Sequence, residues 1–177
     1  SDNVRGVYVD GTAIYAATID GLSISTNGGN TFTNRKPSDG LGDALVWDVY
    51  AAGATVYAAT NGGLSISIDG GSSFINRGPA SGLSKFVFGV YVAGGVIYAA
   101  TDLGLSISTD GGASFITRTI DDGVGGKVSG VYALGTTVYA ATSGGLSIST
   151  NGGDDCEQHQ QQVATVDLHE NGDENDE

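Results

Sequence analysis

Apolar and polar residues alternate along most of this chain in short runs, which is the period of a β-strand with one buried face. Between residues 46 and 77 there are four such runs, Val46 to Ala51, Val56 to Thr60, Leu64 to Ile68 and Ser73 to Arg77. Short glycine-containing segments separate them, as in antiparallel hairpins. This stretch therefore predicts one antiparallel four-stranded sheet.

The same pattern occurs four times. The first tyrosines of the four copies, Tyr8, Tyr50, Tyr91 and Tyr132, are 42, 41 and 41 residues apart. A fixed period of about 40 residues with strands inside it is typical of β-propeller blades or related repeat arrays. We therefore predict an all-β fold, a β-propeller of four four-stranded antiparallel blades with an atypical last blade, in which the repeats span about residues 4–45, 46–86, 87–127 and 128–168.

Composition agrees with one β domain. The 177 residues include 30 glycines and only two prolines, and 40% of them are hydrophobic, which is enough to bury a core. The propeller is expected over residues 1–168, and the polar segment 169–177 is expected to be an acidic, solvated tail.

The net charge of −13 is uneven, because residues 154–177 contribute −9 of it. Acidic chains without a lysine and arginine cluster repel phosphate backbones, so we expect no nucleic-acid partner. The sequence has no apolar stretch of the about 18 residues that a membrane span needs, so no membrane insertion is expected.

The turn between the third and fourth strands reads Ser-x-Asp/Asn-x-Gly-x-Ser/Thr-Phe in three repeats. A short acceptor side chain and a glycine are what a sharp backbone reversal needs. This pattern resembles the Asp-box, or bacterial neuraminidase repeat, of sialidases and other propellers. The residues expected to shape these turns are Ser25, Asn27, Gly29, Phe32, Ser67, Asp69, Gly71, Phe74, Ser108, Asp110, Gly112, Phe115, Ser149, Asn151 and Gly153. Each complete turn offers at most one carboxylate, so we expect no metal ion there.

A second resemblance overlaps the first. The segment "DGLGDALVWDVYAAGATVYAATNGGLSIS" looks like the repeat of two-component-regulator propellers. Together the two resemblances cover residues 4–153, and they imply a fold more than a function.

The fourth repeat departs from the pattern where Asp154, Asp155 and Cys156 replace the residues that complete the turn. Residues Val163 to Leu168 alternate and could supply its last strand. Alternatively, the chain is a piece of a larger propeller. An open arc would expose apolar surface and favour self-association with a second copy.

Residues 1–153 contain no His, Glu, Cys or Met, so the usual general bases and thiol nucleophiles are missing there. The arginines Arg35, Arg77 and Arg118, each three residues after a turn phenylalanine, could form a sialidase-like cluster or bond a neighbouring blade. We expect no enzyme activity and no cofactor.

The face opposite the Asp-box-like turns carries the most variable connections and is the expected ligand face. The candidate ligand-binding residues are Arg35, Asp39, Trp47, Asp48, Arg77, Lys85, Arg118, Asp121 and Asp122. Trp47 could equally belong to the core. We therefore predict a non-catalytic module that binds a protein or carbohydrate ligand, in an extracellular or cell-surface setting. The alternatives are a truncated sialidase-like hydrolase and a spacer with no ligand.

Overall fold

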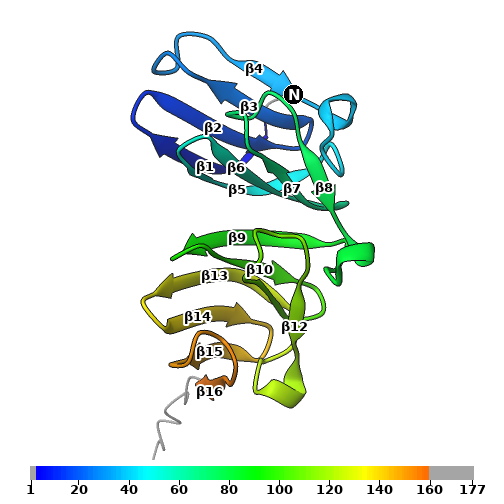
Figure 1. Cartoon of the computed structure of the whole chain (residues 1–177), viewed down its shortest axis with the longest axis vertical. Helices are drawn as coiled ribbons and strands as arrows, with labels where there is room; N and C mark the ends of the chain where they lie inside the picture. The colour runs from blue at the N-terminus through cyan, green and yellow to red at the C-terminus, as the bar shows by residue number, and fades with distance from the viewer. Residues whose placement is uncertain (1–2, 160–177) are drawn as a thin grey trace, which may run out of the picture.

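The computed structural model describes residues 3–159 as four separate four-stranded antiparallel sheets, here called blades 1 to 4 in chain order (Figure 1). This confirms the predicted all-β class and the four blades. Blade 1 contains β1 (Val4–Asp10), β2 (Ala13–Thr18), β3 (Gly21–Ser25) and β4 (Thr33–Arg35); blade 2 contains β5 (Val46–Ala52), β6 (Thr55–Thr60), β7 (Gly63–Ser67) and β8 (Ile75–Arg77). Blade 3 contains β9 (Val87–Ala93), β10 (Val96–Thr101), β11 (Leu105–Ser108) and β12 (Ile116–Arg118); blade 4 contains β13 (Val128–Leu134), β14 (Thr137–Thr142), β15 (Gly145–Ser149) and β16 (Glu157–His159).

Strand alternation gives each blade two different apolar faces, because cross-strand partners share a face. In blade 1, Tyr8 pairs with Tyr15, and Val7 pairs with Ala16 on the opposite side. We call the two sides the tyrosine face and the valine face. In blade 1 the tyrosine face consists of Tyr8, Tyr15, Ala17, Leu22 and Ile24, and the valine face consists of Val7, Val9, Ile14, Ala16 and Ser23.

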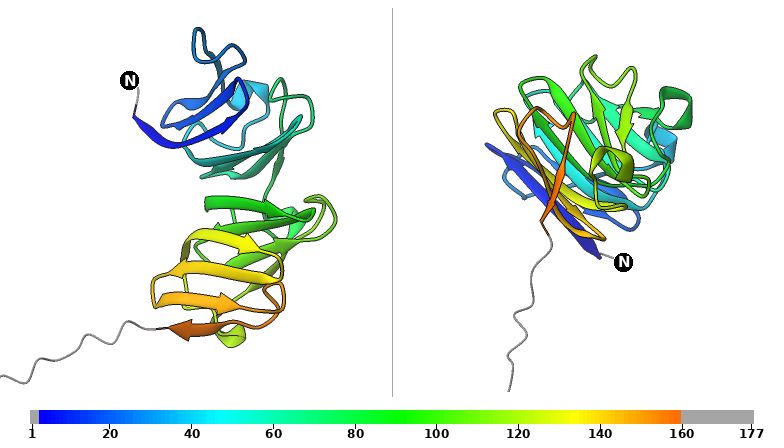
Figure 2. Two further views of the ribbon diagram at one scale, coloured as in Figure 1. Left: turned by 90° about the vertical axis from the view of Figure 1, so that its left-hand side faces the viewer. Right: turned by 90° about the horizontal axis from the view of Figure 1, so that it is seen from below.

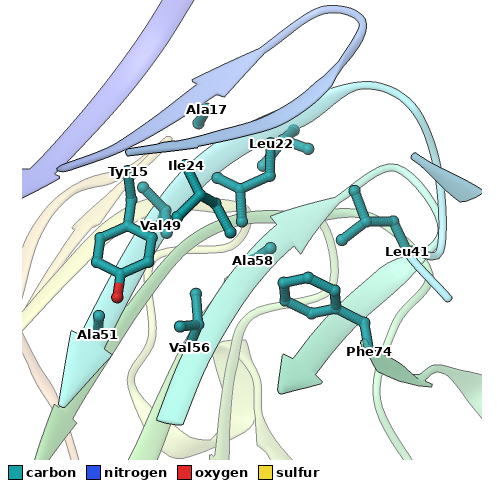
Figure 3. Close-up of a cluster of buried hydrophobic side chains, with 11 residues drawn as sticks. Tyr15, Ala17, Leu22, Ile24, Leu41, Val49, Ala51, Val56, Ala58 and Phe74 are labelled. Atoms are coloured by element: carbon teal, nitrogen blue, oxygen red, sulfur yellow. The ribbon is translucent and has the colours of Figure 1, made fainter. Parts of the chain in front are cut away.

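The core lies between blades, where the tyrosine face of one blade packs on the valine face of the next. Figure 3 shows this between blades 1 and 2, with Tyr15 and Ile24 against Val49 and Ala58. Two further clusters of the same composition join blade 2 to blade 3 and blade 3 to blade 4. Small residues opposite large ones let the twisted sheets approach closely.

A linker between blades fastens each interface. Three short 3₁₀ helices, Pro37–Asp39, Pro79–Ser81 and Ile120–Asp122, follow the fourth strands of blades 1 to 3. The carbonyls of Asp39, Ser81 and Asp122 accept hydrogen bonds of 2.9, 2.8 and 3.0 Å from N–H groups of the next blade. Those N–H groups belong to Phe74, Phe115 and Cys156. The next apolar residue of each linker, Leu41, Leu83 or Val124, is buried in the interface.

The fourth strands differ from the sequence prediction. The sequence predicts that blade 2 resumes its sheet at Ser73, but β8 begins at Ile75, because Ser73 donates its N–H to the Asp69 carboxylate and stays in the turn. In blade 4 the last strand is Glu157–His159, with the buried side chain of Cys156 where the other repeats have phenylalanine. The alternative strand at residues 163–168 lies outside the described residues.

The blades form an open arc in chain order. The first strands β1, β5, β9 and β13 contact one another in sequence, while blades 1 and 4 lie at opposite ends of the molecule (Figures 1 and 2). Within residues 3–159, no helix has the length and apolar character needed to cross a membrane.

Glycine after each 3₁₀ helix permits the linker contact. Gly82 has a φ of +79°, and a Cβ there would lie 2.5 Å from the Phe115 carbonyl oxygen in blade 3. Gly53, in the hairpin of blade 2, has a φ of +59° and open space around it. Both positions favour glycine, but only Gly82 lies against the backbone of another blade.

We therefore expect Gly82→Ala to destabilise the protein more than Gly53→Ala. The backbone conformation alone costs about 1–2 kcal/mol at either position, and the clash adds roughly 2 kcal/mol at Gly82. Equilibrium urea unfolding, followed by circular dichroism, measures the difference. Equal losses for the two variants would contradict this account of the linker.

Candidate functional site

The starts of the four first strands bring together a row of aromatic and cationic side chains, which we call the cation–aromatic row. It consists of Arg5, Trp47, Phe88 and Lys127. The Arg5 guanidinium lies 4.2 Å from the Trp47 ring centroid, and Lys127 Nζ lies 4.0 Å from that of Phe88. The Trp47 and Phe88 rings meet edge to face at 5.6 Å. Two aromatic rings are thus flanked by two positive charges, an arrangement that cation–π attraction stabilises.

The row lies on the face opposite the Asp-box-like turns. Trp47 Nε1 donates a 2.8 Å hydrogen bond to Asn61 Oδ1, and Asn61 belongs to the turn between β6 and β7. In each blade the start of the first strand and the turn between the second and third strands lie at the same end, because neighbouring strands are antiparallel. Trp47 and Phe88 are half-buried, whereas Arg5 and Lys127 are exposed. The row is therefore a surface that a ligand can reach.

A second aromatic series runs along the same strands. Tyr8, Tyr50, Tyr91 and Tyr132 stack from blade to blade with ring centroids 4.9, 5.2 and 4.7 Å apart. Burial raises the pKa of the Tyr50 and Tyr91 hydroxyls, with the neighbouring tyrosines adding to the effect. These ring contacts join the first strands of neighbouring blades.

Of the residues predicted from sequence, Trp47 lies in this row but Asp48 does not. Asp48 Oδ1 accepts the Val49 N–H at 2.9 Å, and Oδ2 accepts the Val90 N–H at 3.1 Å. Burial raises the pKa of this carboxyl. The bond from Val90 connects blade 2 to blade 3, so the visible role of Asp48 is structural.

The predicted arginines lie apart from the row, at the ends of the fourth strands of blades 1 to 3, one on each blade. Arg35 lies 3.8 Å from Asp39, and Arg118 lies 3.8 Å from Asp122. Arg118 also reaches across to Asp154 of blade 4 at 2.6 Å. The structure does not bring these arginines to one centre.

The remaining candidates are also dispersed. Lys85 Nζ lies 4.7 Å from the Phe86 ring centroid, and Asp121 is exposed on the third 3₁₀ helix. Four residues after Arg77 the chain has Ser81. At the equivalent position Arg35 has Asp39 and Arg118 has Asp122. The sequence-based set thus contains one member of the cation–aromatic row.

Sequence reasoning missed Arg5, Phe88 and Lys127. Arg5, Trp47, Phe88 and Ser129 occupy one position of the repeat, the residue after the first valine of each first strand. The four residues at that position differ from one another, although the strands around them are alike. This difference is the sequence signal that could have indicated the row. Trp47 is the only tryptophan in the sequence, but it is also the repeat equivalent of Arg5 and Phe88.

The Asp-box-like turns are closed by their own side chains. In blade 2, Ser67 Oγ donates to Asp69 Oδ1 at 2.7 Å, and Ser73 Oγ donates to Asp69 Oδ2 at 2.7 Å. Gly71 N–H donates to Ser67 Oγ at 2.8 Å. In blade 4, Asn151 Oδ1 accepts the Asp155 N–H at 3.0 Å, so Asp155 takes the place of the missing hydroxyl residue. These bonds give the turns a structural role.

Comparisons with known proteins show the β-propeller fold. No family model and no curated protein matches the chain. Among solved structures, an ancestral GH74 enzyme matches with a TM-score of 0.74 and 22% identity, over 90% of this chain and 24% of that one. The extracellular domain of a hybrid two-component system from B. thetaiotaomicron gives 0.73 and 15%, over 92% and 23%. YCF48 bound to D1 peptide gives 0.58 and 12%, over 88% and 52%. The chain spans about a quarter of the first and second of these propellers and about half of the third.

The two aspartate turns should make stability depend on acid. The Ser73 hydroxyl is the main cause that lowers the pKa of Asp69, and the Ser114 hydroxyl does the same for Asp110. A carboxyl whose pKa is lower in the folded state stabilises the protein above its unfolded pKa, and this contribution is lost as the pH falls toward the folded value.

We therefore expect the double variant Asp69→Asn/Asp110→Asn to lose less thermal stability than the unmodified protein between pH of about 4 and 2. Asparagine already stands in the equivalent turn of blade 1, where Asn27 accepts the Thr31 N–H at 3.0 Å. Melting temperatures over that pH range test the expectation. The control is Asp10→Asn/Asp121→Asn, which removes two exposed carboxylates outside these turns, and an equal effect there would refute the assignment.

Proposed function

We propose that this protein is a non-catalytic β-propeller module that binds an acidic polypeptide segment of a partner protein at the cation–aromatic row. The observation that carries the proposal is the placement of Arg5 and Lys127 at the two ends of the Trp47 and Phe88 pair. Within residues 3–159, neither cation is in an ion pair with a carboxylate. Both side chains are exposed on this face.

The chemistry of the row favours a polypeptide. Tryptophan and arginine are enriched among the residues that dominate protein–protein binding energies, and rigid aromatic surfaces bind with little loss of side-chain freedom. A propeller of similar fold, YCF48, is described bound to a peptide. The negative net charge opposes an acidic ligand weakly, since residues 154–177 carry most of it and salt screens charges beyond about 8–10 Å.

Several features support a non-catalytic role. Residues 1–153 lack His, Glu, Cys and Met, and the half-buried Asp48 beside the row is committed to two backbone N–H groups. Glycoside hydrolysis needs two placed carboxylates or an equivalent nucleophile and acid. The similarity to a GH74 enzyme concerns the fold and a quarter of that chain.

We further infer that the repeats are of the Asp-box type and that the protein acts outside the cell or at its surface. The hydrogen bonds within the four turns support the first inference. The second is supported by a structural relative that is an extracellular domain.

Binding to a fluorescein-labelled glutamate–tyrosine copolymer peptide tests the proposal. We expect the double variant Arg5→Gln/Lys127→Gln to raise its Kd at least about tenfold, which corresponds to about 1.4 kcal/mol. The control is Lys36→Gln, which also removes a lysine charge but lies away from the row, in contact with Asp20 at 2.8 Å. Fluorescence anisotropy at physiological and high salt measures both.

Three outcomes would contradict this function. Equal losses for the double variant and for Lys36→Gln would show that the copolymer binds without using the row. Binding of neutral glucan oligosaccharides in preference to the copolymer would assign the row to carbohydrate. Turnover of fluorogenic glycosides by the purified chain would establish an enzyme.

A further inference from the structure

The two ends of the arc expose the two halves of an interface that the protein itself forms three times. Val7 on the valine face of blade 1 is 60% exposed, whereas its equivalent Val49 is 3% exposed beneath blade 1. Tyr139 on the tyrosine face of blade 4 is 37% exposed, whereas its equivalent Tyr98 is 3% exposed beneath blade 4. Contiguous apolar surface of this kind marks a site of association.

The valine face of blade 1 also has a hollow of about 310 Å³. It is lined by Val4, Ala16, Ser23 and Phe32 among others. Phe32 is 50% exposed, whereas its equivalents Phe74 and Phe115 are buried against the preceding blade. The face is thus shaped like the other valine faces but lacks the blade that would cover it.

A specific contact recurs at the three internal interfaces. Each isoleucine of the third strand packs against the motif glycine of the next blade, so that Ile66 lies on Gly112 and Ile107 lies on Gly153. Ile24 and Gly71 form the first of these contacts. In blade 4 the equivalent isoleucine is Ile148, at the uncovered end, and in blade 1 the equivalent glycine is Gly29, at the other end.

We propose that the occupant of each end face is a second copy of this chain, with the tyrosine face of blade 4 on the valine face of the partner's blade 1. This contact places Ile148 on the partner's Gly29 and Tyr132 beside the partner's Tyr8, as Tyr91 lies beside Tyr132 within the chain. The proposed contact repeats an interface that already exists within the chain. The contact of Ile148 with the partner's Gly29 and that of Tyr132 with the partner's Tyr8 each have three counterparts between blades of one chain. The ligand proposal is not needed for it.

The contact is head-to-tail, so it either closes into a ring or continues into a filament. Propellers contain about four to eight blades. Residues 3–159 of one chain leave both end faces exposed and form an open arc, whereas three chains would exceed the range. Two chains give a closed ring of eight blades, which buries both pairs of end faces and continues the tyrosine series and the cation–aromatic row around the ring.

The test is the mass of the full chain in solution, measured by light scattering and sedimentation under reducing conditions so that Cys156 cannot cross-link. We expect a dimer. Val7→Lys and Tyr139→Glu should each give a monomer, because each variant places a charge in both contacts of the ring. The matched control is Ile68→Lys, since Ile68 is 80% exposed in a turn away from both end faces, and it should remain dimeric.

Mixing the two monomeric variants provides a second, independent measurement. A mixed ring contains one copy of each variant and therefore has one unaltered contact. In the other contact the lysine introduced by Val7→Lys faces the glutamate introduced by Tyr139→Glu. Val49 and Tyr15 face each other in the equivalent way in Figure 3. We therefore expect the mixture to form dimers that neither variant forms alone. Because both substituted residues are exposed in the single chain, circular dichroism should show each variant folded.

A monomeric unmodified chain would overturn the proposal. A dimer that survives both substitutions would overturn it too, since another surface would then hold the copies together. Open filaments, or a mixture of the two variants that stays monomeric, would exclude the closed head-to-tail ring.

Discussion

Close approach of unlike sheet faces is the interaction on which the structure depends. A face of tyrosine, leucine and isoleucine packs against the alanine and valine side chains of the next blade, which Ile97 joins in blade 3. Dispersion contacts and burial of apolar area then join sheets that share no backbone ladder. The linker also positions the following blade. Its 3₁₀ helix accepts a hydrogen bond from that blade, and its apolar residue is buried in the interface between the two blades. Each blade is thereby placed by its predecessor.

This stacking also builds the candidate site. Neighbouring first strands bring together residues about 40 positions apart in sequence, so side chains at the start of each blade become a continuous row. The row contains two aromatic rings and two cations, and the strands that carry them follow the same pattern in the four blades. These residues contact one another across neighbouring blades, but they lie outside the buried clusters that join the sheet faces.

The sequence predicted the fold well, because period, alternation and turn chemistry are local properties. The strands of blade 2 were placed to within two residues at each end, and the turns close through Ser67, Asp69 and Gly71 as their chemistry required. The site was harder to predict. Asp48 and Arg118 were candidate ligand-binding residues, but their partners, Val90 and Asp154, come from other blades and depend on how the blades pack. The replacement of phenylalanine by Cys156 is visible in the sequence, but the strand that follows it is not, because Glu157–His159 has no apolar alternation.

The dependence of each blade on its neighbours alone has a consequence for how the chain opens and closes. In such a quasi-one-dimensional array, stability is approximately a sum of repeat and nearest-neighbour contributions, so a blade with two neighbours is held more firmly than a blade with one. In a single chain, fluctuations should therefore begin at blades 1 and 4 and progress inward, leaving amide protons of β6 and β10 exchanging slowest, whereas the proposed ring gives every blade two neighbours. The repeat thus divides the molecule into a slow centre and faster ends, although the four sequences are nearly alike.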